Sequence, residues 1–172
     1  MKSIGVGMIG SGFMGLTYGH CLKAHVEGAH LGGIAGGSRA GKLASDFEVS
    51  ADESVDAMLA RSDIDAVILA TPDQYRLEIT AKAAAAGKHV LVEKPMAPTV
   101  AECDEMIRLC DQAGVNLGVV KTERFRTITR KAKPLIDDGT IRQRSKRTLD
   151  RELPIQFRIK SEEHRAHRAA TE

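Results

Sequence analysis

The chain has 172 residues, a formal net charge of +2 and 42% hydrophobic residues, which suits one compact domain with an appended segment. No apolar run approaches the roughly 20 residues that cross a bilayer, and the N-terminus lacks the features of a signal peptide. These features argue against a membrane protein and predict a cytoplasmic one. The three cysteines lack metal-like spacing, so neither a disulfide framework nor a metal site is expected.

The first apolar run of the chain leads directly into a glycine pattern, Gly10-x-Gly12-x-x-Gly15. This pattern is typical of a dinucleotide-binding turn, in which Gly10 permits the tight turn, Gly12 lets the backbone approach a pyrophosphate and Gly15 lets the helix pack closely. Phe13 and Met14 complete the predicted cofactor-binding set at this turn. An ordinary strand-to-helix turn would also explain the glycines, so other motifs of the chain are needed to distinguish the two interpretations.

Strand-like runs alternate with helical patterns as far as about residue 120. Strands are predicted at residues 3–9, 31–35, 66–70, 89–92 and 116–120, and helices at residues 14–25, 39–47, 55–60, 75–86 and 100–113. Apolar strands separated by helices form a parallel sheet covered on both faces. The predicted fold class is therefore α/β, a doubly wound parallel sheet of the NAD(P)-binding Rossmann type, and ligands are expected at the carboxyl ends of its strands.

The segment after the second strand carries no carboxylate. An NAD-selective site normally places Asp or Glu there, about 20 residues beyond the glycines, to bind the ribose hydroxyls. Here the chain has Ser38 and Arg39, a hydroxyl and a guanidinium that could bond a 2′-phosphate. These two residues predict that NADP is preferred over NAD. The alternative is that Arg39 is only a solvated residue in the first turn of its helix.

Two further motifs follow later strands: Ala70-Thr71-Pro72, and Glu93-Lys94-Pro95. With the glycine turn they occur in the order and at the spacing found in one family. The chain resembles the N-terminal domain of the Gfo/Idh/MocA family of NAD(P)-dependent oxidoreductases, named after glucose-fructose oxidoreductase, inositol dehydrogenase and a rhizopine catabolism protein. The resemblance extends over roughly residues 1–141.

The resemblance implies that Thr71 and Pro72 line the nicotinamide end of the cofactor site and that Glu93 and Lys94 lie beside the reacting centre. Lys94 is the candidate catalytic residue, because an ammonium there could bond the substrate hydroxyl and stabilise a developing alkoxide. The implied activity is hydride transfer between the cofactor and a hydroxyl of a sugar, cyclitol or related polyol. In the alternative interpretation, Glu93 and Lys94 form an exposed ion pair worth at most about 1 kcal/mol.

One position departs from the family pattern. Relatives often have a histidine four residues beyond the proline of the second motif, whereas this chain has Arg76. Two roles remain open for Arg76: a positive charge near the cofactor, or a solvated residue on the first turn of its helix.

The pattern changes toward the C-terminus. We expect a Rossmann domain at residues 1–120, a linking segment with a helix at 121–141, and a basic, poorly ordered tail at 142–172. Family members usually continue into a substrate domain, so a truncated chain is expected, with homo-oligomerisation possible. A non-catalytic dinucleotide-binding module is the alternative function. His164 and His167 are interpreted as solvated, and the basic run at 142–151 lacks the aromatic residues typical of a nucleic-acid-binding arm.

Overall fold

The computed structural model describes residues 3–140 of the chain. The chain divides into two compact units, Met1–Val120 and Lys121–Glu172. The expected basic tail at 142–172, together with His164 and His167, lies outside the described residues.

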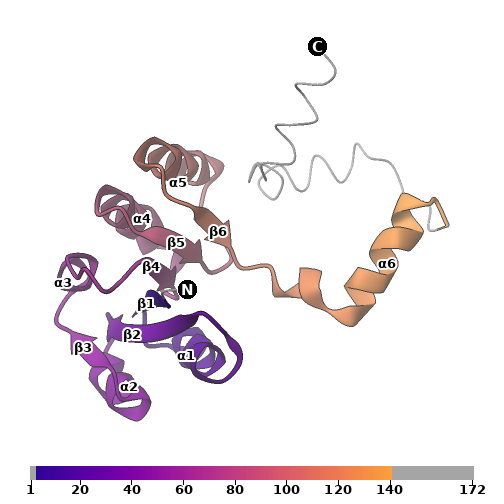
Figure 1. Ribbon diagram of the computed structural model, residues 1–172. Coiled ribbons are helices and arrows are strands. Elements are labelled where there is room, and N and C mark those ends of the chain that lie inside the picture. Colours follow the sequence, from indigo (N-terminus) through magenta and orange to yellow (C-terminus); the bar gives the residue numbers. More distant parts are fainter. Residues whose placement is uncertain (1–2, 141–172) are drawn as a thin grey trace. The chain divides into compact units, whose positions relative to one another are not determined.

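The first unit contains a six-stranded, all-parallel sheet with the strand order β3-β2-β1-β4-β5-β6 (Figure 1). The strands are β1 (Ile4–Ile9), β2 (Ala29–Ala35), β3 (Ser50–Asp52), β4 (Ala66–Leu69), β5 (His89–Val92) and β6 (Leu117–Val119). This order is that of a doubly wound dinucleotide-binding sheet, so the predicted fold class is confirmed. Strand β3 was not predicted, because its sequence Ser-Ala-Asp has no apolar run.

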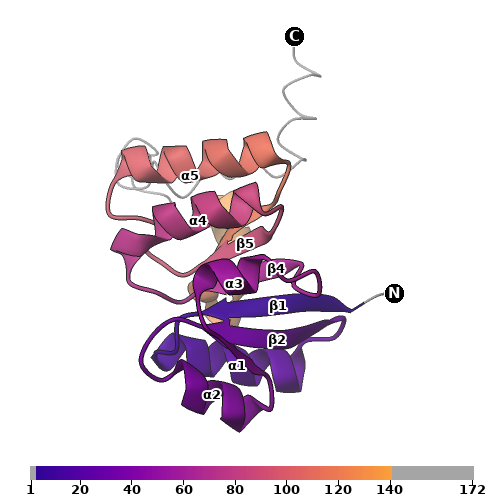
Figure 2. The ribbon, with the colours of Figure 1, turned by 90° about the vertical axis from the view of Figure 1, so that its left-hand side faces the viewer.

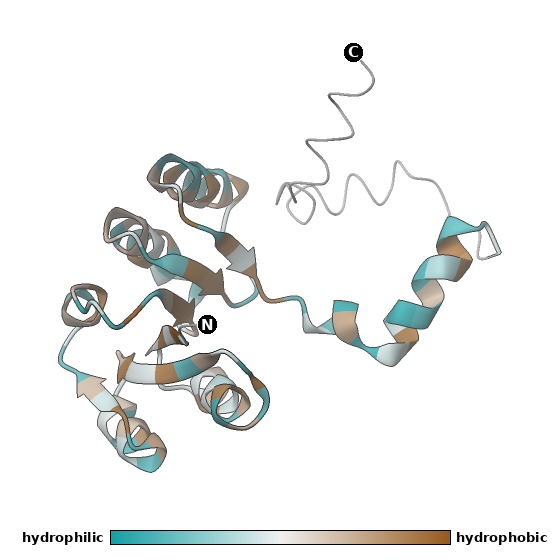
Figure 3. Cartoon of the chain, in the orientation of Figure 1, coloured by the Kyte–Doolittle hydropathy of each residue, from teal (hydrophilic) through white to brown (hydrophobic). Residues whose placement is uncertain are grey.

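Helices lie on both faces of this sheet (Figures 1 and 2). They are α1 (Phe13–His25), α2 (Ala40–Phe47), α3 (Val55–Leu59), α4 (Arg76–Ala85) and α5 (Val100–Ala113), with a 3-10 turn, η1 (Asp73–Tyr75), directly before α4. Helices α1 and α2 are on one face, and α3, α4 and α5 are on the other. Helix α5 presents a mainly hydrophilic side away from the sheet (Figure 3).

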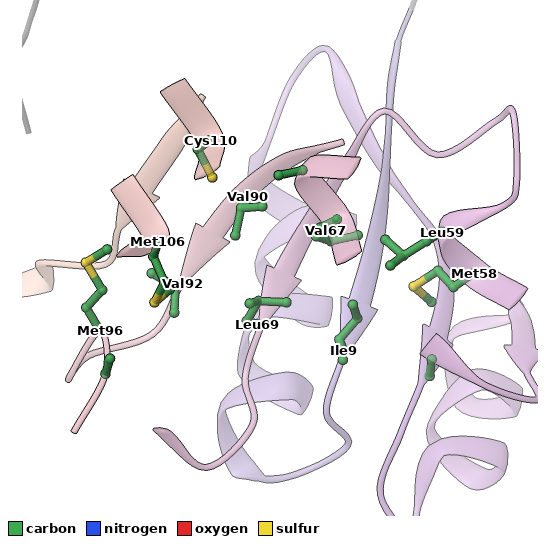
Figure 4. Close-up of a cluster of buried hydrophobic side chains, with 14 of the residues drawn as sticks. Ile9, Met58, Leu59, Val67, Leu69, Val90, Val92, Met96, Met106 and Cys110 are labelled. Atoms are coloured by element: carbon green, nitrogen blue, oxygen red, sulfur yellow. The ribbon is translucent and has the colours of Figure 1, made fainter. Parts of the chain in front are cut away.

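Two apolar clusters form the core, one on each face of the sheet. Successive side chains of a strand point to opposite faces, so Met8 packs in the cluster beneath α1 and α2 while its neighbour Ile9 packs in the cluster beneath α3, α4 and α5. In the second cluster Ile9, Leu69 and Val92 come from three adjacent strands (Figure 4). Strands β1 and β4 therefore pack against apolar side chains on both faces.

Strand β5 differs from the expectation of burial on both faces. Its residues alternate between exposed and buried, and Leu91 is 38% exposed. Among the described residues, helices thus cover only one face of this strand.

The described part of the second unit holds a 3-10 turn, η2 (Thr122–Phe125), and a helix, α6 (Thr127–Asp137), which contains Pro134. Phe125 and Ile128 are largely exposed. Of the helices in residues 3–140, none combines the length and the apolar character needed to cross a membrane.

Candidate functional site

Three segments that follow strands are tied together at the carboxyl edge of the sheet. Gly10, after β1, donates its N–H to the carbonyl of Ala35 in β2 at 2.8 Å. Ala70, after β4, donates to Ile9 in β1 at 2.8 Å, and the N–H of Glu93, after β5, donates to Leu69 in β4 at 3.0 Å. The ladder therefore continues one residue past the strands and brings the glycine turn and both later motifs to one edge.

The glycines of the turn meet different surroundings. Gly10 has φ +114°, and a Cβ there would lie 2.7 Å from the carbonyl oxygen of Ala70. A Cβ on Gly15 would lie 2.1 Å from the carbonyl oxygen of Gly10. Around Gly12, by contrast, a Cβ would meet nothing within 4 Å. Gly10 and Gly15 are thus needed for close packing of the backbone, whereas Gly12 borders open space at the turn.

Helix α1 begins at this open space. Gly12 is its N-cap residue, no side chain caps the helix, and no acidic residue occurs in its first turn. The N–H groups and dipole at such a helix start favour an anion. Phe13 is 76% exposed and Met14 is half-buried, so the two residues between the glycines differ in accessibility.

The segment after β2 approaches the glycine turn through Ser11. This residue is buried, and its Oγ accepts a hydrogen bond from the N–H of Arg39 at 3.3 Å. A Cβ on Gly37, which has φ +83°, would lie 2.4 Å from the same Oγ. Ser38 and Arg39 are exposed. Ser11 was not predicted as part of the site, although the Gly36-Gly37 pair indicates that another group approaches closely there.

In the motif after β4, Thr71 is half-buried and Pro72 is exposed. The hydroxyl oxygen of Thr71 is buried and has no hydrogen-bond partner in the described structure. Buried polar atoms are nearly always paired, so this hydroxyl is an exception, as is the hydroxyl of Thr80 in α4.

In the motif after β5, Glu93 is buried and its carboxylate accepts a hydrogen bond from the Tyr18 hydroxyl of α1. Burial, and then the bond to Glu93 and the charge of that carboxylate, raise the pKa of Tyr18 above its ordinary range. A residue on the helix that begins at the glycine turn thus contacts the Glu-Lys-Pro motif. Tyr18 was not predicted as part of the site, because the contact joins residues 75 positions apart.

Lys94 is exposed and forms no hydrogen bond or ion pair with another described residue. Its neighbour Glu93 is buried. The alternative interpretation, an exposed ion pair between these two residues, is therefore wrong. The peptide bond between Lys94 and Pro95 is cis.

Arg76 does not face solvent, so that alternative for it is wrong. The residue is only 5% exposed, and its guanidinium donates hydrogen bonds to the backbone carbonyls of Thr71, Glu93 and Pro95. Burial lowers its pKa, against the opposing effect of nearby Asp73 and Glu93.

Comparison with known proteins agrees with this geometry. The model of the Gfo/Idh/MocA family, an oxidoreductase family with an NAD-binding Rossmann fold, matches residues 4–121. The chain belongs to this family.

Relatives within the family include a 2,7-anhydro-N-acetylneuraminate hydratase of Mediterraneibacter gnavus, 34% identical over 82% of the chain and 37% of the relative. An NADP(+)-dependent scyllo-inositol 2-dehydrogenase of Bacillus subtilis is 29% identical over 82% of the chain and 39% of the relative. A crystal structure of scyllo-inositol dehydrogenase from Lactobacillus casei with bound NAD(H) and scyllo-inositol matches with a TM-score of 0.76 and 26% identity, covering 83% of this chain and 43% of that one. The chain thus spans less than half the length of each.

The residues at the sheet edge fit a nicotinamide dinucleotide. The space above Gly12 and the uncapped start of α1 suit a pyrophosphate. The family resemblance assigns the segment of Thr71, whose hydroxyl is unpaired, to the nicotinamide end, and the segment of the exposed Lys94 to a place beside the reacting centre.

The contrast between Gly15 and Gly12 gives a matched test. Gly15→Ala should lower the free energy of unfolding by about 2 kcal/mol, because its methyl group collides with backbone. Gly12→Ala should stay within about 1 kcal/mol of the wild type, yet weaken dinucleotide binding roughly tenfold by filling the open space. Denaturant unfolding and ligand titration measure these effects; equal stability losses in the two variants would contradict the packing described.

Tyr18→Phe removes the donor to the buried Glu93 carboxylate and should lower the free energy of unfolding by about 1–2 kcal/mol at pH 7. Because folding raises the Tyr18 pKa, its stabilising effect is present below the ordinary value of 10.0 and is lost as pH rises above it. The difference between wild type and variant should therefore shrink in alkaline solution. Denaturant unfolding as a function of pH checks this, with the exposed Tyr75→Phe as control, and a pH-independent difference would refute it.

Proposed function

We propose that this chain binds a nicotinamide dinucleotide, NADP in preference to NAD, and serves hydride transfer between that cofactor and a hydroxyl of a sugar, cyclitol or related polyol. The observation that carries the proposal is the convergence of the glycine turn and the two later motifs at one sheet edge. The bound scyllo-inositol and NAD(H) of the Lactobacillus casei relative support the class of substrate and cofactor.

The preference for NADP rests on the segment after β2. Residues 36–39, Gly-Gly-Ser-Arg, contain no carboxylate that would repel a 2′-phosphate. Ser38 and Arg39 are exposed, and the backbone of Arg39 is held to the glycine turn through Ser11. A guanidinium binds phosphate oxygens through paired, charge-assisted hydrogen bonds. Family relatives use either cofactor, NADP(+) in the Bacillus subtilis enzyme and NAD(H) in the Lactobacillus casei structure, so the proposed preference rests on residues 36–39.

Lys94 is the residue proposed to act on the substrate. A bound nicotinamide would supply the hydride chemistry. The Lys94 ammonium is exposed and free of described partners, so it can donate a hydrogen bond to a substrate hydroxyl and stabilise negative charge that develops on its oxygen. Glu93 remains buried beneath it and is held by Tyr18, which restricts the backbone that carries Lys94.

A paired titration with NADPH and NADH, followed by nicotinamide fluorescence, tests the cofactor assignment. The wild type should bind NADPH more tightly, and Arg39→Gln should weaken NADPH binding roughly tenfold with little effect on NADH. Lys42→Gln is the matched control, because Lys42 is an exposed cation of the same helix region and is paired with Asp46. Equal affinity for both dinucleotides would overturn the preference, and binding of neither would overturn the proposed cofactor.

Turnover distinguishes an enzyme from a non-catalytic dinucleotide-binding module. NADP reduction is measured across a panel of polyols and sugars that includes scyllo-inositol. Lys94→Ala should lower turnover by about 100-fold or more while NADPH still binds. Tight binding without turnover on any member of the panel would favour the binding module, and unchanged turnover in the variant would exclude the role of Lys94.

A further inference from the structure

Arg76 is a buried cation whose hydrogen bonds all go to backbone carbonyls. Its Nε and Nη2 donate to the Thr71 carbonyl at 3.0 and 2.6 Å, and its Nη1 donates to the Glu93 carbonyl at 2.6 Å and also to the Pro95 carbonyl. No carboxylate of the described chain shares a hydrogen bond with it. The guanidinium therefore binds the main chain, and its position determines where two segments of main chain can lie.

These carbonyls belong to the segments that follow β4 and β5. The two strands pair as far as Leu69 and Val92, and one more backbone bond, from Glu93 to Leu69, extends the ladder. Beyond that point Thr71 and Pro95 have left the ladder, and the Arg76 guanidinium joins their carbonyls instead. Lys94 lies between Glu93 and Pro95, both of which Arg76 binds.

A guanidinium is suited to this arrangement. It has five N–H donors in a rigid plane, whereas a lysine ammonium concentrates three donors at one atom and an imidazole has at most two. Burying a cation is unfavourable unless hydrogen bonds compensate for the lost water. Arg76 meets this requirement by donating to three carbonyls from one rigid plane.

Residue 93 is held from two directions. Arg76 binds its carbonyl, and Tyr18 of α1 binds its carboxylate. Through these contacts the Glu-Lys-Pro segment is connected both to the segment after β4 and to the helix that begins at the glycine turn.

We propose that Arg76 is a positioning residue. By binding the carbonyls of Thr71, Glu93 and Pro95 it fixes the position of Lys94 relative to Thr71, and so orients the nicotinamide end of the cofactor site. This inference rests on the proposed function. Family members often have histidine here, so this chain holds the two segments with a different group. Arg76 contacts neither cofactor nor substrate in this account and acts through the carbonyls that it binds.

The test compares two ligands that differ only in whether the nicotinamide end is present. Arg76→Lys retains the charge but loses the fork of donors. It should weaken NADPH about tenfold and reduce nicotinamide fluorescence enhancement, while 2′-phospho-ADP-ribose, which lacks only the nicotinamide ring, keeps its affinity within about twofold. Arg76→His, which supplies the residue common in relatives, should show the same split. Arg108→Lys is the control, because Arg108 is half-exposed on α5 and bonds only within that helix.

A parallel loss of both ligands would mean that Arg76 stabilises the fold in general, and unchanged NADPH binding would mean that it positions nothing; either result overturns the inference. A measurement without ligand tests the role of Arg76 independently of the proposed function. In ¹H–¹⁵N spectra, Arg76→Lys should shift the amide signals of Lys94 and Met96 and leave those of Gly12 and Met14 in place. If the wild type binds no dinucleotide, the proposed function fails. If the Lys94 and Met96 signals do not move, the contact between Arg76 and residues 93–95 is refuted, whatever the dinucleotide result.

Discussion

The site depends on the parallel register of β1, β4 and β5, continued past the strand ends by backbone hydrogen bonds. The bonds from Ala70 to Ile9 and from Glu93 to Leu69 extend the ladder by one residue beyond β4 and β5. Two apolar clusters, one on each face of the sheet, keep this register: β1 and β4 contribute to both clusters and β5 to one, and a slip of one residue would send their buried side chains to the wrong face. Three short motifs, far apart in sequence, therefore end at one edge.

Beyond the ladder, the loops are held by close approach and by buried polar groups. Gly10 and Gly15 allow backbone to pack directly on backbone, and Ser11 joins the glycine turn to the segment after β2. Arg76 and Tyr18 then fix the Glu-Lys-Pro segment. These buried groups hold the loops in place, while the space at Gly12 stays open and Lys94 stays exposed. A binding site requires both supported loops and accessible groups.

Much of this could be predicted from the sequence, because local patterns encode it. Apolar runs located five of the six strands, and the motifs placed the candidate residues after the right strands. Strand β3 was missed since Ser50–Asp52 carries no apolar signal and pairs only with β2. The burial of Arg76 and the contact between Tyr18 and Glu93 were missed because they depend on groups brought together by the fold. Arg side chains are mostly exposed in proteins and Tyr side chains are intermediate, so residue type alone predicts neither contact.

The most direct test of the account is a crystal structure of the chain with NADPH. The account predicts the pyrophosphate above Gly12 at the start of α1, the 2′-phosphate beside Ser38 and Arg39, and the nicotinamide between Thr71 and Lys94. A dinucleotide bound away from this edge, or one bound there in the reverse direction, would contradict it.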